Sequence, residues 1–545
     1  MEKSNKRRKV TAEKITEILT EENIELDEDL DIFSDDDSVA DPDFDPFIGF
    51  SDDEVDEELE NQLYNLQIQE ERELLIEEER EDEDEQEEEI SAPVWSDFIG
   101  RQVNFPFTGE EGVRIHFNQP ECLKPKDTFH YLIDDDVLQL IVEQTNIYAE
   151  QITSKRRLNQ SLTPHARHSR WVPTSVQEIK TFLGMTLWMG LDCKGTIADY
   201  WSQSPLYRNE LARKMSRNRY ELLLNCFHFA DNSQINPEDR LGKIQPLIDI
   251  LIRKYQASYT PGSDVVIDES LIPWRGRLKF RQYIPNKAHK YGIKLFKLCS
   301  MKGFTYNLSV YSGKSATGKR EVGIAKRVCE ELMSGLLNQG RTLYVDNFYT
   351  SYDLAIDFLK KRNTHVIGTI RKTRKQMPKI VMEAKLKKGE MLSKEDENGV
   401  VILKWKDVRD VTVLSTKHKP NLVEVPRNRR IRPSEIEGNE HAMREEEDQE
   451  NENLTGPSSA NSQRRGRESA KKKPEAIVAY NAGKIGIDLS DQLASYATTL
   501  RKGVKWYRKL GLELLLGLSV INAKVLYEEI KKEKYLLDHS ERKLL

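Results

Sequence analysis

Cysteine is scarce in this sequence. Five cysteines occur in 545 residues, at positions 122, 193, 226, 299 and 329, and no two of them form a CxxC pair. This distribution argues against a disulfide framework, offers no zinc-ligand spacing and is typical of reduced thiols in an intracellular protein. We therefore expect neither structural disulfides nor a zinc module.

Long uninterrupted hydrophobic runs are also missing. The longest apolar stretch, LGLELLLGLSVINAKVLY from Leu510, contains Glu513, Asn522 and Lys524. A membrane-spanning helix needs about 20 predominantly apolar residues. This stretch therefore predicts a helix of the protein core, and we expect no membrane partner.

The N-terminus has no apolar signal region. It carries instead the cluster KRRKV at residues 6–10. This cluster is similar to nuclear import signals and predicts a nuclear location, while a loose basic chain end is the alternative.

Charge is divided unevenly along the chain. Residues 1–90 contain 37 acidic and 8 basic residues, a net charge of −29, whereas the whole chain carries −9, which leaves +20 for residues 91–545. Acidic runs such as EEEREDEDEQEEE cannot bury enough apolar surface to fold, so we expect an acidic disordered tail over residues 1–90. The basic body suits a polyanionic partner. The alternative is that its lysines and arginines only aid solubility.

Apolar periodicity separates a helical first half from a β-rich second half. Apolar residues recur every three or four positions around Trp188 and Phe227, which predicts amphipathic helices. From Asp264 the runs DVVIDESLIPW, GIKLFKLCS and TYNLSVYSG predict three strands. A helix (VGIAKRVCEELMSGLL), a strand (TLYV), a helix (SYDLAIDFLKKRN) and a strand (HVIGTIR) follow. The order β-β-β-α-β-α-β predicts an α/β fold.

A polar segment interrupts this pattern. Residues 425–474 are charged and contain few apolar side chains, which predicts a disordered insertion. Folded character resumes with AIVAYNAGKIGIDLSDQ.

Two carboxylates follow apolar strand sequences, Asp268 after VVI and Asp346 after LYV. Taken alone, each is most simply a residue that caps a turn. Asp488 and Asp491 lie three residues apart at the start of a predicted helix, where they share one face and the helix dipole favours negative charge. An ordinary acidic first turn is the alternative for this second pair.

Together these acids suggest a metal site. Carboxylate oxygens are hard ligands that suit Mg²⁺ or Mn²⁺ better than zinc. Two such ions, about 3.5 to 4 Å apart, activate the attacking oxygen and stabilise the leaving oxygen of a phosphodiester. The first and fourth strands are also where a ribonuclease-H-like nuclease core carries its acids.

Five segments, taken together and in this order, resemble the piggyBac transposase family. They are DESLIPWRGR, FRQYIPNKAHKYGIKLFKLC, YVDNFYTS, LKWKDVRDV and YNAGKIGIDLSDQ, and the likeness covers nearly the whole body from about residue 95. The resemblance implies a cut-and-paste DNA transposase of the DDD type with an RNase-H-like catalytic core. It implies that Asp268, Asp346 and Asp488 are catalytic metal ligands and that Asp491 is a further catalytic acid. Double-stranded DNA is the implied partner, cut at terminal inverted repeats and joined at TTAA targets.

The resemblance also implies an interleaved domain organisation. A split all-α dimerisation and DNA-binding domain would occupy residues 91–263 and 498–545, and the catalytic core residues 264–376 and 475–497. Residues 377–474 would form the insertion, largely disordered from 425. A homodimer is implied, and in-line displacement at phosphorus needs no cofactor beyond the metal.

Basic residues of these segments are candidate phosphate contacts, although a single lysine or arginine is more often only solvated. The candidates are Arg275, Arg277, Lys279, Arg281, Lys287, Lys290, Arg371, Lys372 and Arg374.

Two features depart from the family pattern. Lys484, Ile485 and Gly486 stand where the family usually has a Met-Gly-Gly turn, and no cysteine follows Cys329, although many members end in a cysteine-rich zinc module. Two rival interpretations remain. One is a domesticated DNA-binding or chromatin protein without transposition activity, and the other is an interaction protein whose acidic tail is the functional part.

Overall fold

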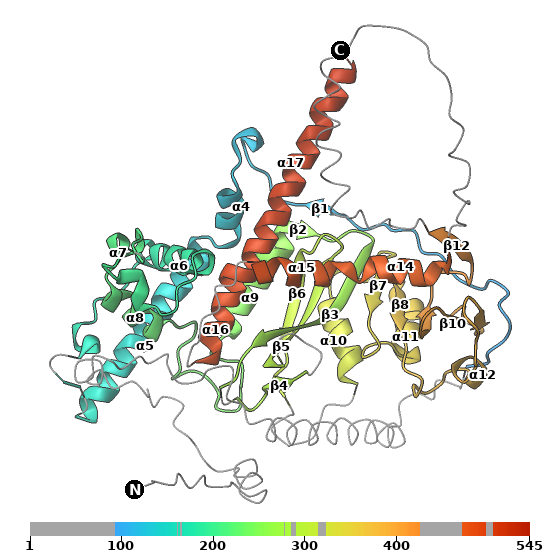
Figure 1. The fold of residues 1–545 in the computed structure, drawn as a ribbon, viewed down its shortest axis with the longest axis horizontal. Helices are drawn as coiled ribbons and strands as arrows, with labels where there is room; N and C mark the ends of the chain where they lie inside the picture. Colours follow the sequence, from blue (N-terminus) through green and yellow to red (C-terminus); the bar gives the residue numbers. More distant parts are fainter. Residues whose placement is uncertain are drawn as a thin grey trace, which may run out of the picture. The chain divides into compact units, whose positions relative to one another are not determined.

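The computed structural model describes most of the chain after residue 92 (Figure 1). The described residues are 93–160, 162–163, 166–205, 207–276, 278–284, 290–313, 323–425, 471–496 and 505–544. The predicted acidic tail, the KRRKV cluster and residues 426–470 of the predicted insertion lie outside them. Backbone contacts divide the chain into a small unit that includes Ala149–Pro173 and a large unit that includes the other described residues. Within the small unit, the Arg156 guanidinium lies 3.2 Å from Nδ1 of His168.

Helices dominate the first half of the chain, as the apolar periodicity predicts. Ser175 and Ser216 cap two of them, because each hydroxyl accepts a hydrogen bond from the backbone N–H three residues later. The buried rings of Phe182, Phe227 and Phe229 pack between these helices. The helices are α4 (Pro125–Leu132), α5 (Asp135–Leu158), α6 (Val176–Leu191), α7 (Leu211–Lys214), α8 (Arg217–Cys226) and α9 (Gln245–Ser258).

The last helices of the chain pack against the first ones. They are α16 (Trp506–Leu512), a π-helical turn (Glu513–Leu518) and α17 (Ser519–Leu544). The Thr128 hydroxyl on α4 donates to the carbonyl of Ala523 at 2.9 Å, and the hydroxyls of Tyr255 and Ser519 lie 2.7 Å apart. Helices from both ends of the sequence therefore share one buried interface.

The apolar stretch from Leu510 lies in this helical part. Among the described residues, one helix, Trp506–Lys532, is long and apolar enough to cross a membrane by length and composition, with a mean hydropathy of 1.5. In that apolar window 72% of the residues are buried inside the fold, as in a core helix.

The central sheet has the predicted order of strands and helices. β3 (Asp264–Pro273), β5 (Tyr291–Ser300) and β6 (Thr305–Val310) are antiparallel neighbours, followed by α10 (Ile324–Leu332), β7 (Thr342–Val345), α11 (Tyr352–Arg362) and β8 (His365–Thr369). β7 pairs in parallel with both β3 and β8. The sheet has nine strands, which include β4 (Gln282–Tyr283) and, after β8, β9 (Met391–Glu395), β10 (Val401–Lys406) and β11 (Asp410–Ser415). Their order is β4-β5-β3-β7-β8-β11-β10-β9, with β6 on β5. Apart from the two-residue β4 between β3 and β5, the order β-β-β-α-β-α-β is therefore confirmed, in a mixed α/β fold.

The predicted insertion contains more structure than its composition suggests. β9 (Met391–Glu395), β10 (Val401–Lys406) and β11 (Asp410–Ser415) extend the central sheet beyond β8, after the short α12 (Lys379–Met382). β12 (Leu422–Val425) pairs with β13 (Lys471–Pro474), so the prediction of disorder was wrong for both ends of residues 425–474. Glu424 faces Lys472 in this pair, and opposite charges on neighbouring strands stabilise it.

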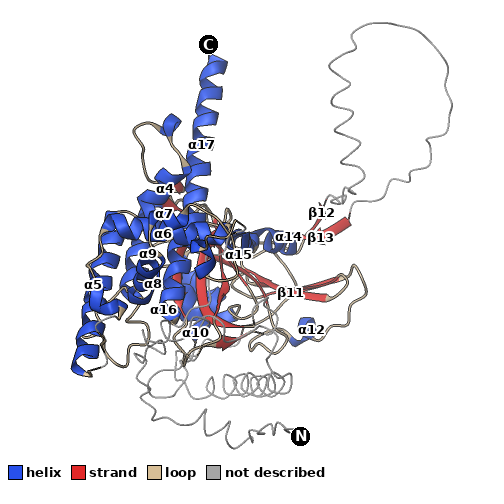
Figure 2. Ribbon diagram, turned by 60° about the vertical axis from the view of Figure 1, so that its left-hand side comes forward, coloured by secondary structure: helices blue, strands red, loops and turns tan. Residues whose placement is uncertain are grey.

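Helices cover both faces of the sheet. α14 (Glu475–Gly483) and α15 (Ile485–Tyr496) run across the strands, with Ile477 and Ile487 in one core cluster with Val266 and Tyr344 (Figure 1). α10 lies on the other side (Figure 2), where the side chain of Asn307 donates to the carbonyl at the end of α10. This arrangement brings the start of α15 against β3.

Candidate active site

Two neighbouring strands and one helix place three aspartates together. In the parallel pair β3 and β7, Ile267 lies opposite Val345, so Asp268 and Asp346 follow at adjacent positions. Asp346 comes directly after β7, as predicted, whereas β3 continues to Pro273, because its pairing with β5 persists after β7 ends. Asp488 lies in the first turn of α15.

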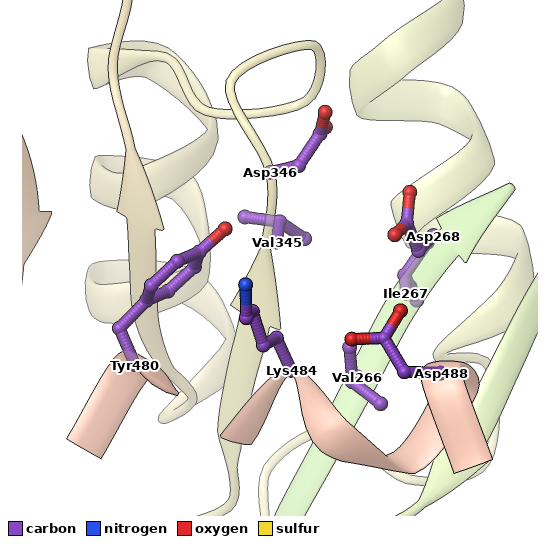
Figure 3. A pocket seen from close by; sticks show the side chains of 8 residues that line it. All are labelled: Val266, Ile267, Asp268, Val345, Asp346, Tyr480, Lys484 and Asp488. Carbon is purple, nitrogen blue, oxygen red and sulfur yellow. The ribbon is translucent and has the colours of Figure 1, made fainter. Parts of the chain in front are cut away.

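The three carboxylates line one small pocket (Figure 3). The pocket has a volume of about 220 Å³, which is less than that of typical organic-ligand sites and suits ions with one phosphate group. Figure 3 shows the side chains of Asp268 and Asp488 facing each other, with Asp346 on the neighbouring strand end. The lining residues are Val266, Ile267, Asp268, Val345, Asp346, Tyr480, Lys484 and Asp488.

Glu269 adds a fourth carboxylate at this end of the sheet. One carboxylate oxygen from each of Asp268, Glu269 and Asp346 lies within 4.8 Å of the others. Backbone N–H groups orient two of them, since Asp268 accepts from Glu269 at 2.8 Å and Asp346 accepts from Phe348 at 2.9 Å. The sequence showed Glu269 only as a neighbour of Asp268, and its adjacency in sequence was the available signal.

Burial and mutual repulsion disfavour the ionised form of these carboxylates. Burial, followed by the charges of Glu269 and Asp346, raises the pKa of Asp268 to about 8. Burial and then Glu269 also raise the pKa of Asp346. A divalent cation would relieve this repulsion, and hard carboxylate oxygens are the donors that Mg²⁺ and Mn²⁺ prefer. The residues present therefore fit such an ion.

The raised pKa of Asp268 has a consequence for the metal-free protein. Between about pH 4 and 8 the folded state retains a proton that the unfolded chain releases, so the stability from this group is lost as pH rises through about 8. We expect the melting temperature of metal-free wild-type protein to fall more steeply from about pH 6 to 8 than that of Asp268→Asn. Melting curves at a series of pH values measure this, and parallel pH profiles would contradict the raised pKa.

Asp491 does not line the pocket. Its Oδ1 accepts a hydrogen bond from the hydroxyl of Ser270 at 2.7 Å and lies 2.6 Å from Nζ of Lys297. The structure thus brings together three of the four predicted acids and directs the fourth to a lysine on β5. Its predicted catalytic role stays a prediction.

Tyr480 and Lys484 form the wall of the pocket opposite the acids. The sequence analysis noted Lys484 only as a departure from the family pattern and assigned neither residue to the site. Figure 3 shows the Lys484 ammonium beside the Tyr480 hydroxyl. Burial raises the pKa of Tyr480 to about 12, so its hydroxyl keeps its proton. The available signal was the spacing of four residues from Tyr480 to Lys484 to Asp488, which is typical of one helix face. In the structure two helices meet here, since α14 ends at Gly483 and α15 begins at Ile485.

Two of the predicted DNA-contacting arginines lie beside Asp346. Arg371 Nε donates to the Asn347 side chain at 3.3 Å, and Arg374 Nη2 donates to the Phe348 carbonyl at 2.6 Å. Both hold the loop that directly follows Asp346.

The other residues predicted to contact DNA differ in their surroundings. Arg281 donates to the carbonyl of Arg275 at 2.9 Å and lies over the Tyr291 ring. Arg275, Lys279, Lys290 and Lys372 are exposed, whereas Arg277 and Lys287 lie outside the described residues. Lys294, which the sequence did not single out, lies over the Phe348 ring, and its charge opposes the raised pKa of Asp346.

Known proteins are similar to this chain in sequence and in fold. A family model described as Transposase IS4 matches residues 124–524, well over half of the chain. The human PiggyBac transposable element-derived protein 3 is 27% identical over 300 residues, 54% of this chain and 48% of that protein. The human PiggyBac transposable element-derived protein 2 is 25% identical over 304 residues, with the same coverage of 54% and 48%. The chain therefore spans about half the length of the curated relatives it matches.

A solved structure has a similar fold. The cryo-EM structure of a piggyBac transposase synaptic complex with hairpin DNA matches with a TM-score of 0.60 and 24% identity, covering 78% of this chain and 79% of that one. Fold and family model together define the class as the transposases. Within this class, the chain belongs to the piggyBac family.

Proposed function

We propose that this chain is a cut-and-paste DNA transposase of the DDD type. It would cleave double-stranded DNA at terminal inverted repeats with Mg²⁺ or Mn²⁺ and join the ends to TTAA targets. The observation that carries the proposal is the convergence of Asp268, Asp346 and Asp488, from two strands and a helix, on one pocket. The test is metal-dependent cleavage of duplex DNA.

The strand order supports an RNase-H-like catalytic core. β6, β5 and β3 are consecutive antiparallel neighbours, and α10 and α11 connect them to the parallel strands β7 and β8. In such a core the first strand and the end of the fourth carry acids, which are here Asp268 and Asp346.

The pocket residues have different roles in the proposed reaction. A divalent cation bound by the carboxylates would polarise a phosphodiester and activate the attacking oxygen. Asp268, Asp346 and Asp488 supply the negative charge that retains cations. Lys484, across the pocket, supplies a positive charge for a non-bridging phosphate oxygen. In-line displacement at phosphorus then needs no covalent link to the protein.

The wider organisation of the chain is also part of this proposal. The contacts of Ala523 with Thr128 and of Ser519 with Tyr255 support one helical domain built from residues 91–263 and 498–545. We assign dimerisation and DNA binding to this domain. A nuclear homodimer with DNA as its partner completes the proposal, and the KRRKV cluster motivates the location.

DNA binding should depend strongly on salt. Phosphate contacts by the basic body release counterions, so affinity for duplex DNA is expected to fall at least about 10-fold between 50 and 200 mM salt. Lys372→Ala should flatten the logarithmic salt slope by about 1, whereas Lys361→Ala, an exposed lysine paired with Asp357, should not change it. Fluorescence anisotropy with a labelled duplex measures both. A flat titration would indicate a different kind of partner.

The second candidate is a DNA-binding or chromatin protein without transposition activity. The likeness to two human transposable element-derived proteins favours it. It predicts DNA binding with the same salt dependence but no strand cleavage in Mg²⁺ or Mn²⁺.

A further inference from the structure

A buried ion pair lies next to the acidic pocket. Lys297 Nζ is 2.6 Å from Asp491 Oδ1, and the lysine side chain is only 4% exposed. The Ser270 hydroxyl donates to the same oxygen at 2.7 Å, and the Ser490 hydroxyl lies 3.3 Å from Nζ. Burial alone would lower the pKa of Lys297, but the charge of Asp491 holds it above its ordinary value. The lysine therefore stays charged in the fold.

The pair joins the elements that carry the pocket acids. Lys297 on β5 lies directly opposite Asp268 on β3, and Ser270 is two residues further along β3 on the same face. Asp491 is three residues after Asp488, almost one turn further along α15. The contact thus fastens the first turns of α15 to the two strands beside the pocket.

The position of Asp488 depends on how this contact holds α15. Asp488 is exposed, and among the described residues no hydrogen bond or ion pair holds its carboxylate. Its position relative to Asp268 and Asp346 therefore follows from where α15 docks on the sheet. Three features fix that docking: the close approach of Gly486 to Ser300, the burial of Ile487 against Val266, and the ion pair of Asp491 with Lys297.

We propose that Lys297 and Asp491 form a positioning clamp, which sets Asp488 for metal binding, and that Asp491 is not itself a ligand. This inference rests on the proposed metal site. Asp491 could reach the pocket only by leaving Lys297 buried without its partner, which is strongly unfavourable. Asp491 would then matter for the reaction without touching metal or DNA.

The test is a double-mutant cycle on metal affinity. Tb³⁺ prefers hard oxygen ligands and serves as the probe ion. A nearby tyrosine sensitises its luminescence, and Tyr480 in the pocket wall can do so here. Lys297→Met and Asp491→Asn should each lower Tb³⁺ affinity about 10-fold, as loss of an outer-shell partner does. The double variant should lose no more than either single one, because both remove the same contact. Lys297→Arg should retain part of the affinity, because it keeps the charge.

A matched control separates positioning from general stability. Lys404 on β10 is also a buried strand lysine, paired with Asp410 at 3.5 Å. Lys404→Met should lower the melting temperature but leave Tb³⁺ affinity unchanged. If Lys297→Met does the same, the pair is only structural and the clamp is wrong.

Two other outcomes are decisive. If Asp491→Asn loses as much affinity as Asp488→Asn while Lys297→Met loses none, Asp491 is a ligand and the clamp is wrong. If Lys297→Met does not fold, the size of the Asp491→Asn loss decides: about 10-fold supports the clamp, whereas a loss as large as that of Asp488→Asn overturns it. If Asp488→Asn binds Tb³⁺ like the wild type, the proposed metal site fails, and the clamp with it.

Discussion

Asp346→Asn is expected to reduce metal-dependent nicking of duplex DNA by at least about 100-fold, since loss of even an outer-shell partner of a metal ligand costs 10- to 100-fold. Asp346 is half-buried at the end of β7, and its carboxylate lies with those of Asp268 and Glu269 within 4.8 Å. The amide keeps the size of the side chain but removes the charge that a cation needs. Asp268→Asn and Asp488→Asn should have the same effect for the same reason.

The measurement is single-turnover nicking of supercoiled plasmid in Mn²⁺, with duplex binding followed in parallel. Binding should persist in all three variants, because the phosphate contacts are made elsewhere. Asp264→Asn is the matched control, since Asp264 is on the same strand as Asp268 but bonds to Tyr344 and Ser263 outside the pocket. Wild-type nicking by any pocket variant would remove that residue from the site.

Gly486→Ala is expected to reduce nicking about 100-fold without touching a charged group. A Cβ at Gly486 would lie 2.4 Å from the carbonyl oxygen of Ser300 and 3.0 Å from the Val266 side chain. A backbone oxygen cannot rotate away, so α15 must move off the sheet and carry Asp488 with it. Misplacement of a reacting group by about 1 Å can cost 100-fold in rate. Overpacking should also destabilise the fold by about 1 to 3 kcal/mol.

Gly184→Ala provides the control for this prediction. Gly184 is on α6, and a Cβ there would have no atom within 4 Å. Alanine is a better helix former than glycine by about 1 kcal/mol, so this variant should be as stable as the wild type or more so. Melting temperature and nicking rate, measured for both variants, give the comparison. Wild-type values for Gly486→Ala would show that close docking of α15 does not position Asp488.

Local sequence pattern was enough to predict the central order of elements and two of the pocket acids. Apolar runs of strand length ended at Asp268 and Asp346, and the pairing of parallel strands then brought the two together. The resemblance to the piggyBac family added Asp488, whose helix begins where its sequence predicts. These features depend on residues that are near one another in sequence or on a known order of strands.

The features that were missed depend on distant parts of the chain. Lys297 and Asp491 are 194 residues apart, and neither sequence neighbourhood indicates the other. The extension of the sheet by β9, β10 and β11 depends on pairing β11 with β8, a choice that composition does not specify. Tyr480 and Lys484 were within reach of helical periodicity, but Gly483 between them and the break between α14 and α15 obscured their common place in the pocket wall.

The most direct test of the central claim is where a metal ion binds. A crystal grown in Mn²⁺ and measured at the manganese absorption edge should show anomalous density in contact with the carboxylates of Asp268, Asp346 and Asp488. The same experiment on Asp346→Asn should show that density lost or strongly weakened. Manganese absent from this pocket in the wild-type crystal, or bound only elsewhere on the protein, would contradict the account.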